Sequence, residues 1–181
     1  MIKGAPSHNS NSIGKLTINN RNRIERIAMA THFRKIEKRD EADFLRYTRL
    51  FYASEAVDHD IPESFHKDAF EEMLERDLYM FGYMFEVDGK NVGYAIISKT
   101  YSHEGGGMGW WIEEIYIEPD YRKKGIGKAF FMFIDEERKK DRDVTRIRLE
   151  VELNNERAIK LYRSCGYEVL DYGQMIKQLR K

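Results

Sequence analysis

The sequence of 181 residues contains one cysteine, three prolines and no long apolar run. A single cysteine excludes a disulfide framework and a cysteine-based zinc site, because each needs at least two thiols. Without a run of about 18 apolar residues, the sequence predicts no membrane-spanning helix and no membrane partner. It also lacks the apolar segment of a secretory signal, so we expect a cytoplasmic location.

An excess of charge of one sign is also absent. Lys+Arg and Asp+Glu each number 31, so the formal net charge is +0. Proteins that coat nucleic acid are usually basic, and we therefore expect no nucleic-acid partner. Hydrophobic residues make up 41% and aromatic residues 13% of the chain, which is enough for the core of one domain and excludes global disorder.

The neutral total conceals an uneven distribution of charge. Residues 1–28 carry five basic groups and one acid (5 − 1 = +4), whereas residues 29–181 carry 26 basic and 30 acidic groups (26 − 30 = −4). No aromatic residue occurs in the first 32 positions. Such a segment buries little, so we predict a poorly ordered basic extension over 1–28 and one domain over 29–181. An organelle presequence and a start at Met29 stay open as alternatives.

Periodicity along the domain predicts alternating strands and helices. Helical spacing of apolar residues predicts helices over 40–57, from 62 onward, over 128–140 and over 154–165. Aromatic and β-branched runs predict strands over 32–37, 79–87, 92–101, 110–117, 147–151, 167–170 and 174–179. The order βααβββαβαββ contains a strand–helix–strand crossover, which predicts an α/β fold with a mixed sheet and helices on both faces.

The most informative segment, 115–129, places a basic turn with two glycines between a strand and a helix. Gly125 and Gly127 lack side chains, so a ligand can approach the backbone closely. The first turn of the helix directs free N–H groups and a positive dipole end toward the same place. Four cations surround the turn: Arg122, Lys123, Lys124 and Lys128. This combination indicates a phosphate or diphosphate site.

Other readings of the turn fit less well. A nucleotide P-loop requires Ser or Thr after the lysine, but Ala129 follows Lys128. A dinucleotide fingerprint requires a third glycine where Phe130 stands. A helix–hairpin–helix DNA module requires a helix before the turn, whereas a strand ending at Pro119 is predicted. A basic surface turn without a ligand stays open as the remaining alternative.

The string from Arg122 to Gly127 resembles the Arg/Gln-x-x-Gly-x-Gly/Ala signature of the GNAT superfamily of acetyl-CoA-dependent N-acetyltransferases. A second block resembles the family further along the chain: Asn154, Ala158, Leu161-Tyr162 and Gly166-Tyr167. The predicted order of elements is also that of the family, so the resemblance covers 32–179. Lys124 departs from the pattern, since many members carry glycine there. The resemblance implies a GNAT fold whose fourth and fifth strands, 110–117 and 148–153, splay apart.

This resemblance implies acetyl-CoA as co-substrate and no metal. In the family the diphosphate lies on the turn before the helix, and backbone of the fourth strand pairs with the pantetheine arm. The implied binding residues are Ile115, Tyr116, Ile117, Arg122, Lys123, Lys124, Gly125, Ile126, Gly127, Lys128, Ala129 and Asn154. Asn154 also stands where a helix begins, so a helix cap is an equal alternative for it.

Catalytic candidates come from the same resemblance and from the chemistry of amines. Tyr162 aligns with the family tyrosine that protonates the departing thiolate, although its helical spacing also allows a core position. The acceptor amine must lose a proton before attack, and Glu113 or Glu114 is the candidate base, directly or through a water. Strand alternation predicts that these two side chains lie on opposite faces. The string Ile112-Glu113-Glu114 resembles one in several small-amine acetyltransferases, which favours Glu113.

We therefore expect an enzyme that transfers the acetyl group of acetyl-CoA directly to a primary amine of a small molecule or protein, in a ternary complex. A non-catalytic acyl-CoA-binding sensor of the same fold is the alternative. Acidic residues over 55–63 are expected to attract a cationic acceptor, or else form an ordinary solvated turn. Many family members dimerise, so a homodimer is compatible with the sequence.

Overall fold

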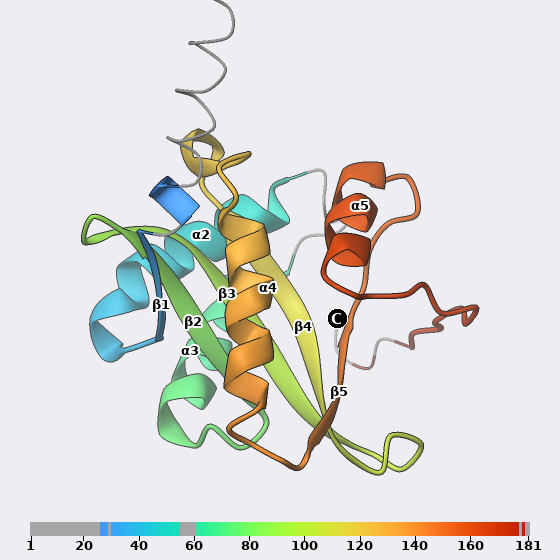
Figure 1. The fold of residues 1–181 in the computed structure, drawn as a ribbon. Helices are drawn as coiled ribbons and strands as arrows, with labels where there is room; N and C mark the ends of the chain where they lie inside the picture. The colour runs from blue at the N-terminus through green and yellow to red at the C-terminus, as the bar shows by residue number, and fades with distance from the viewer. Residues whose placement is uncertain (1–25, 29, 55–60, 178, 180–181) are drawn as a thin grey trace, which may run out of the picture. The chain divides into compact units, whose positions relative to one another are not determined.

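The computed structural model describes residues 26–28, 30–54, 61–177 and 179, which fall into two units divided after Glu150. The first unit is built on a five-stranded sheet in the order β1-β2-β3-β4-β5 (Figure 1). Its strands are β1 (Thr31–Lys35), β2 (Met80–Val87), β3 (Lys90–Ser102), β4 (Gly107–Ile117) and β5 (Val144–Leu149). Neighbouring strands are antiparallel except β4 and β5, which are parallel. The predicted mixed α/β sheet is confirmed.

Helices cover both faces of this sheet. They are α2 (Glu41–Tyr52), α3 (Glu63–Glu75) and α4 (Ile126–Arg138), with short 3-10 turns η1 (Lys38–Asp40) and η2 (Pro119–Tyr121). Figure 1 shows α4 on one face and α2 with α3 on the other. On the α4 face, the ring of Phe130 lies 4.8 Å from that of Phe85. On the opposite face, Phe44 of α2 and Phe70 of α3 pack with Tyr94 of β3.

The hairpin between β2 and β3 forms where the sequence predicts it. Val87 pairs with Lys90 across Asp88 and Gly89, which have φ angles of 52° and 74°. Two consecutive positive φ values characterise the primed turn that suits the twist of a hairpin, and an Asp-Gly pair adopts it readily. This turn fixes the register that places Tyr94 and Ile96 on the face covered by α2 and α3.

The second unit, from Val151 onward, contains α5 (Glu156–Ser164). Asn155 caps this helix, because its side chain accepts a hydrogen bond from the Ala158 N–H at 3.1 Å. The cap expected at Asn154 is therefore one residue later. Gly166, at φ 86°, ends the helix in the left-handed conformation that glycine adopts without strain.

The two final strands predicted from the sequence, 167–170 and 174–179, are wrong for the described residues, which contain no strand there. An alternating apolar pattern forms a strand only where a neighbouring strand pairs with its backbone. Val169, Leu170, Met175 and Ile176 are instead exposed. β5 also ends at Leu149, earlier than the predicted 151.

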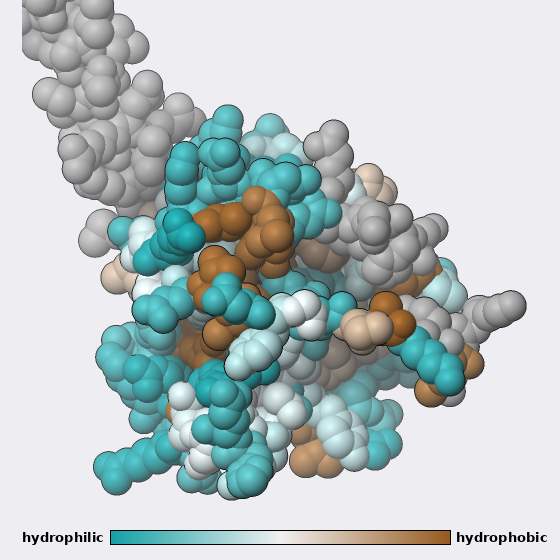
Figure 2. All heavy atoms as spheres, turned by 90° about the vertical axis from the view of Figure 1, so that its right-hand side faces the viewer, coloured by the Kyte–Doolittle hydropathy of each residue, from teal (hydrophilic) through white to brown (hydrophobic). Residues whose placement is uncertain are grey.

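The basic extension predicted over 1–28 lies outside the described residues except for 26–28, which are helical, so it stays a prediction. On the face drawn in Figure 2, the described residues are largely hydrophilic, with hydrophobic side chains gathered near its centre. No helix among the described residues is long and apolar enough to cross a membrane.

Candidate active site

The middle of β4 carries a bulge at Glu113. Ile97 of β3 pairs with Ile112, and the next residue, Ile96, pairs with Glu114, so Glu113 has no opposite partner. A bulge re-aims side chains and interrupts strict alternation. Glu113 and Glu114 consequently line the same cavity, and the prediction of opposite faces is wrong.

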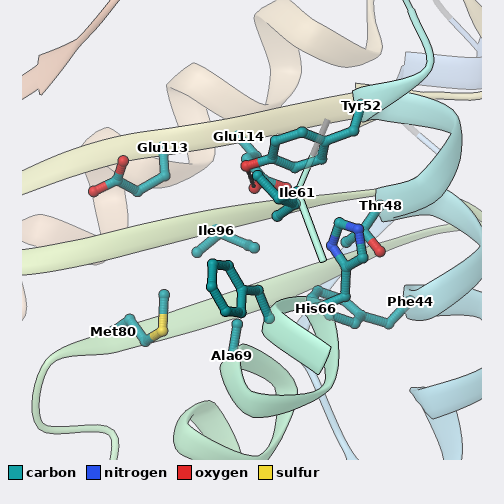
Figure 3. A pocket seen from close by; sticks show the side chains of 11 residues that line it. Phe44, Thr48, Tyr52, Ile61, His66, Ala69, Met80, Ile96, Glu113 and Glu114 are labelled. Carbon is teal, nitrogen blue, oxygen red and sulfur yellow. Dashed lines mark hydrogen bonds between the residues drawn. The ribbon is translucent and has the colours of Figure 1, made fainter. Parts of the chain in front are cut away.

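This cavity lies in the first unit, between β4 and the helices α2 and α3 (Figure 3). Its volume is about 180 Å³. Its lining residues are Phe44, Thr48, Tyr52, Ile61, Phe65, His66, Ala69, Met80, Ile96, Glu113 and Glu114. Figure 3 shows the two glutamates on one side of the space and Ala69 with Met80 on the other.

Two tyrosines hold the carboxylate of Glu114. The hydroxyl of Tyr52 on α2 donates to Glu114 Oε1 at 3.0 Å, and that of Tyr94 on β3 donates to Oε2. Burial raises the pKa of Glu114 above its ordinary value, because it penalises the charged form. The two hydroxyls lower the pKa and the neighbouring charge of Glu113 raises it, and the net shift is upward. A carboxyl group with a raised pKa is suited to exchange a proton nearer neutral pH.

Glu113 has a different environment. Its side chain is exposed, and its Oε1 accepts a hydrogen bond from the Ser98 hydroxyl at 2.6 Å. The bulge therefore presents two carboxylates to one cavity, of which Glu114 is the more enclosed and the more firmly held.

The basic turn leads from β4 through η2 into α4. Gly125, at φ 80°, occupies the N-cap position, and no side chain caps the helix. The first turn of α4 contains no acidic residue, so its N–H groups and dipole favour an anion. Glycine is needed at residue 125 because this φ is unfavourable for other residues.

Cationic side chains accompany this helix N-terminus. Arg122, Lys123 and Lys128 are exposed there. The Arg122 Nε donates to the carbonyl of Ile117 at 2.7 Å, which fixes the start of the turn relative to the end of β4. Lys123 is also left-handed, at φ 61°. Uncapped N–H groups, a left-handed glycine and several cations match the donors that a diphosphate requires, so these residues fit the diphosphate of acetyl-CoA.

β4 is paired with β5 along only part of the length of β4. Their pairing runs from Met108↔Val144 to Ile112↔Leu149, whereas β4 continues to Ile117. β5 has no residue beyond its last pair, so the predicted splaying of the two strands stays a prediction. Ile115, Tyr116 and Ile117 lie beyond the last pair. The Tyr116 side chain is buried against Tyr47, so it is not available to a ligand.

Two predicted residues, Asn154 and Tyr162, belong to the second unit. Tyr162 lies on α5, with its ring centroid 6.3 Å from that of Tyr167. Burial raises the pKa of the Tyr162 phenol, which keeps it protonated at neutral pH and able to donate. Asn154 precedes the cap residue and is exposed.

Sequence reasoning missed the residues that hold the carboxylates. Tyr52, Tyr94 and Ser98 come from three different parts of the chain, and only the folded register brings them to Glu113 and Glu114. Tyr52 falls inside the predicted helix 40–57, but nothing in its spacing indicates a glutamate partner.

The sequence model of the acetyltransferase (GNAT) family matches residues 42–167. The chain belongs to this family. The match includes α2, the bulged strand β4, the basic turn and α5, so every element that carries a candidate residue lies inside it.

Solved structures support the same fold for this GNAT acetyltransferase. A possible acetyltransferase from Clostridium difficile 630 has a TM-score of 0.72 and 21% identity, over 84% of this chain and 99% of that one. Aminoglycoside N-acetyltransferase AAC(6')-Iy in complex with CoA has a TM-score of 0.68 and 16% identity, over 83% and 95%. Ribosomal-protein-alanine N-acetyltransferase from Brucella melitensis biovar Abortus 2308 has a TM-score of 0.66 and 19% identity, over 83% and 99%. At these identities the likeness concerns the fold.

Proposed function

We propose that this GNAT acetyltransferase transfers the acetyl group of acetyl-CoA to a primary amine, directly and in a ternary complex. The observation that carries the proposal is Glu114, an enclosed carboxylate in a cavity, on the strand β4 that continues past the end of β5. N-acetyltransferases among the similar structures, one in complex with CoA, support both the reaction and the donor.

Glu114 is the proposed base, in place of the Glu113 that the sequence favours. An ammonium group in the cavity would give a proton to a Glu114 carboxylate oxygen, leaving the nitrogen lone pair free to attack. The Tyr52 and Tyr94 hydroxyls, each bonded to a different oxygen, would keep the carboxylate in position. Glu113, exposed and bonded to Ser98, would contribute negative charge that attracts the amine.

The first turn of α4, together with Arg122 and the neighbouring lysines, would hold the diphosphate of acetyl-CoA. The backbone of Ile115–Ile117 would pair with the pantetheine arm, in the manner of an added strand. Acetyl-CoA supplies an acyl carbon activated as a thioester. Tyr162 Oη, whose raised pKa keeps it protonated, is the proposed proton donor to the departing sulfur.

A panel of amines incubated with acetyl-CoA tests this function. Free CoA thiol is measured with a colorimetric reagent, and mass spectrometry identifies the acetylated product. We expect thiol release that requires both an amine and the protein, in equal amount to the acetylated product. Binding of acetyl-CoA without transfer to any small amine, peptide or protein would contradict the proposal and favour a non-catalytic sensor.

A further inference from the structure

The cavity beside β4 is negatively charged on one side. Glu113 and Glu114 supply two carboxylates, and the described residues that line the space include no lysine or arginine. Two ionisable rings, His66 and Tyr52, complete the polar lining; His66 is 4% exposed, and the two ring centroids lie 5.2 Å apart. Such a lining favours an ammonium group and disfavours a ligand that carries its own carboxylate.

The rest of the lining is mainly apolar. Six of the lining residues have hydrophobic side chains: Phe44, Ile61, Phe65, Ala69, Met80 and Ile96. Thr48, a polar neighbour, directs its hydroxyl to the carbonyl of Leu45 at 3.2 Å. The groups that can hydrogen-bond a ligand are therefore concentrated at the carboxylates. A ligand rich in hydroxyl groups would have to bury those hydroxyl groups against hydrocarbon.

The volume limits the size of the ligand. The cavity measures about 180 Å³. An apolar cavity of about 150 Å³ in another protein accommodates benzene. One aromatic ring or a short branched alkyl group therefore fits within this volume, whereas several linked sugar rings would extend outside it.

We infer that the acceptor is a small primary monoamine that carries one compact apolar group about as large as a benzene ring. This inference rests on the proposed function, since it names the substrate class of that site. The ammonium lies toward Glu114, and the apolar group lies toward Ala69 and Met80 on the opposite side (Figure 3). A polyamine would place further ammonium groups against the apolar lining. A free amino acid would bring a carboxylate next to the glutamates, and an aminosugar would bury hydroxyl groups against hydrocarbon.

Steady-state kinetics with matched amines test the inference. Phenethylamine is compared with phenylalanine, which adds only a carboxylate to the same amine and ring, and with spermidine and kanamycin. We expect kcat/KM for phenethylamine to exceed each of the others by about 100-fold or more. Equal or greater kcat/KM for phenylalanine, spermidine or kanamycin would overturn the inference. Preference for a peptide with N-terminal phenylalanine would also overturn it, in favour of a protein acceptor.

Variants that change the cavity test its role directly. Ala69→Leu narrows the space, so we expect KM for phenethylamine to rise by about 10-fold while affinity for acetyl-CoA is unchanged. Ser64→Leu adds similar bulk at an exposed and uncharged position of α3, outside the lining, and is the matched control. Phe65→Ala, at a residue already 38% exposed, should shift preference toward larger apolar amines. No change in amine preference in either cavity variant would contradict the inference.

Calorimetric titration with phenethylamine separates this inference from the proposed function. Binding that Ala69→Leu weakens, without acetylation of any amine, would support the ligand class and reject the transfer reaction. Acetylation of spermidine or kanamycin, with neither binding nor acetylation of phenethylamine, would support the reaction and reject the ligand class.

Discussion

At the scale of single residues, two adjacent glutamates differ in role because their surroundings differ. Glu114 is enclosed and accepts hydrogen bonds from two tyrosines, while Glu113 is exposed and accepts one from Ser98. Burial raises the pKa of Glu114 and the tyrosine hydroxyls partly offset that rise. The same type of side chain is therefore suited to accept a proton in one place and to supply surface charge in the other.

Removing one hydroxyl should move the pH dependence of the reaction. In Tyr52→Phe, Glu114 loses a donor that stabilises its charged form, so its pKa should rise further. The base acts only when it is ionised, so the acidic limb of the kcat/KM profile should shift to higher pH. At pH values below the shifted limb, the activity of the variant should be lower than that of the unchanged protein. The measurement is a pH–rate profile beside Tyr101→Phe, whose side chain is 70% exposed. An unshifted profile in Tyr52→Phe would argue against Glu114 as the titrating group.

The sequence predicts this site only in part. Glu113 and Glu114 stand out as carboxylates inside an aromatic strand, and the resemblance identifies the turn around Gly125. The choice between the glutamates depends on a bulge that no glycine or proline marks. It also depends on Tyr52 and Tyr94, which reach Glu114 from another helix and strand. Such long-range contacts cannot be derived from local periodicity.

At the scale of elements, the start of α4 combines a backbone requirement with a binding role. Gly125 adopts φ 80° at the N-cap, while Gly127 lies inside the helix. The two glycines are therefore proposed to bind one ligand, but they differ in backbone conformation, and only Gly125 has a φ that requires glycine.

Alanine substitutions should separate the backbone requirement from the binding role. Gly125→Ala should lower the free energy of unfolding by about 1 kcal/mol, because L-residues are strained at positive φ. Gly127→Ala should raise it by up to about 1 kcal/mol, because alanine favours a helix over glycine. Both variants should bind acetyl-CoA more weakly, since each adds a methyl group where backbone approaches the diphosphate. Denaturant unfolding measures the stability of each variant, and calorimetry measures its affinity for acetyl-CoA. If both substitutions change the free energy of unfolding in the same direction, this account of the turn would be contradicted.

Helices and strands that pack on a neighbouring element are predicted well from the sequence, whereas segments without a pairing partner are not. The hairpin at Asp88-Gly89 and the strand leading to Pro119 agree closely with the sequence pattern. The strands predicted over 167–170 and 174–179 are wrong in the described residues, although their residues alternate. Alternation specifies which face a strand would bury, but it does not supply the neighbouring strand that must accept its hydrogen bonds.

At the scale of the whole molecule, a buried ion pair joins the edge strand β1 to the segment that begins α2. Asp40, 1% exposed, accepts two hydrogen bonds from Arg34, at 2.6 and 2.7 Å, and one from the Glu37 N–H at 2.9 Å. Asn91, at the start of β3, donates to Asp40 at 3.4 Å and to Asp43 at 2.8 Å. These bonds fix α2, and thereby Tyr52, relative to the sheet.

Breaking this pair should destabilise the fold. Burial opposes ionisation of Asp40, but the hydrogen bonds from Arg34 and the backbone lower its pKa below the ordinary value. Asp40→Asn removes the buried counter-charge of Arg34 and leaves it only the partly exposed Glu86, so we expect the free energy of unfolding to fall by about 3 kcal/mol at neutral pH. The pKa of Asp40 is lower in the folded than in the unfolded protein. The ionised carboxylate therefore contributes its full stabilisation at pH values above the unfolded-state pKa. This stabilisation disappears as the pH falls through the folded-state pKa.

Denaturant unfolding across a pH series measures this effect. Asp40→Asn should flatten the decline in stability below the ordinary pKa of aspartate. Glu86→Gln, which removes a partner of Arg34 at 3.0 Å that is 23% exposed, should have a smaller effect. If Asp40→Asn lowers the free energy of unfolding no more than Glu86→Gln does, the claim that Asp40 is the main partner of Arg34 would be contradicted.

The central claim is that this GNAT acetyltransferase acetylates an amine with Glu114 as the base. The most direct test is kcat for acetyl-CoA-dependent acetylation by Glu114→Gln and Glu113→Gln, with affinity for acetyl-CoA measured in parallel. We predict that Glu114→Gln lowers kcat by about 100-fold or more and Glu113→Gln by much less, with acetyl-CoA affinity unchanged in both. Full activity in Glu114→Gln would contradict the claim.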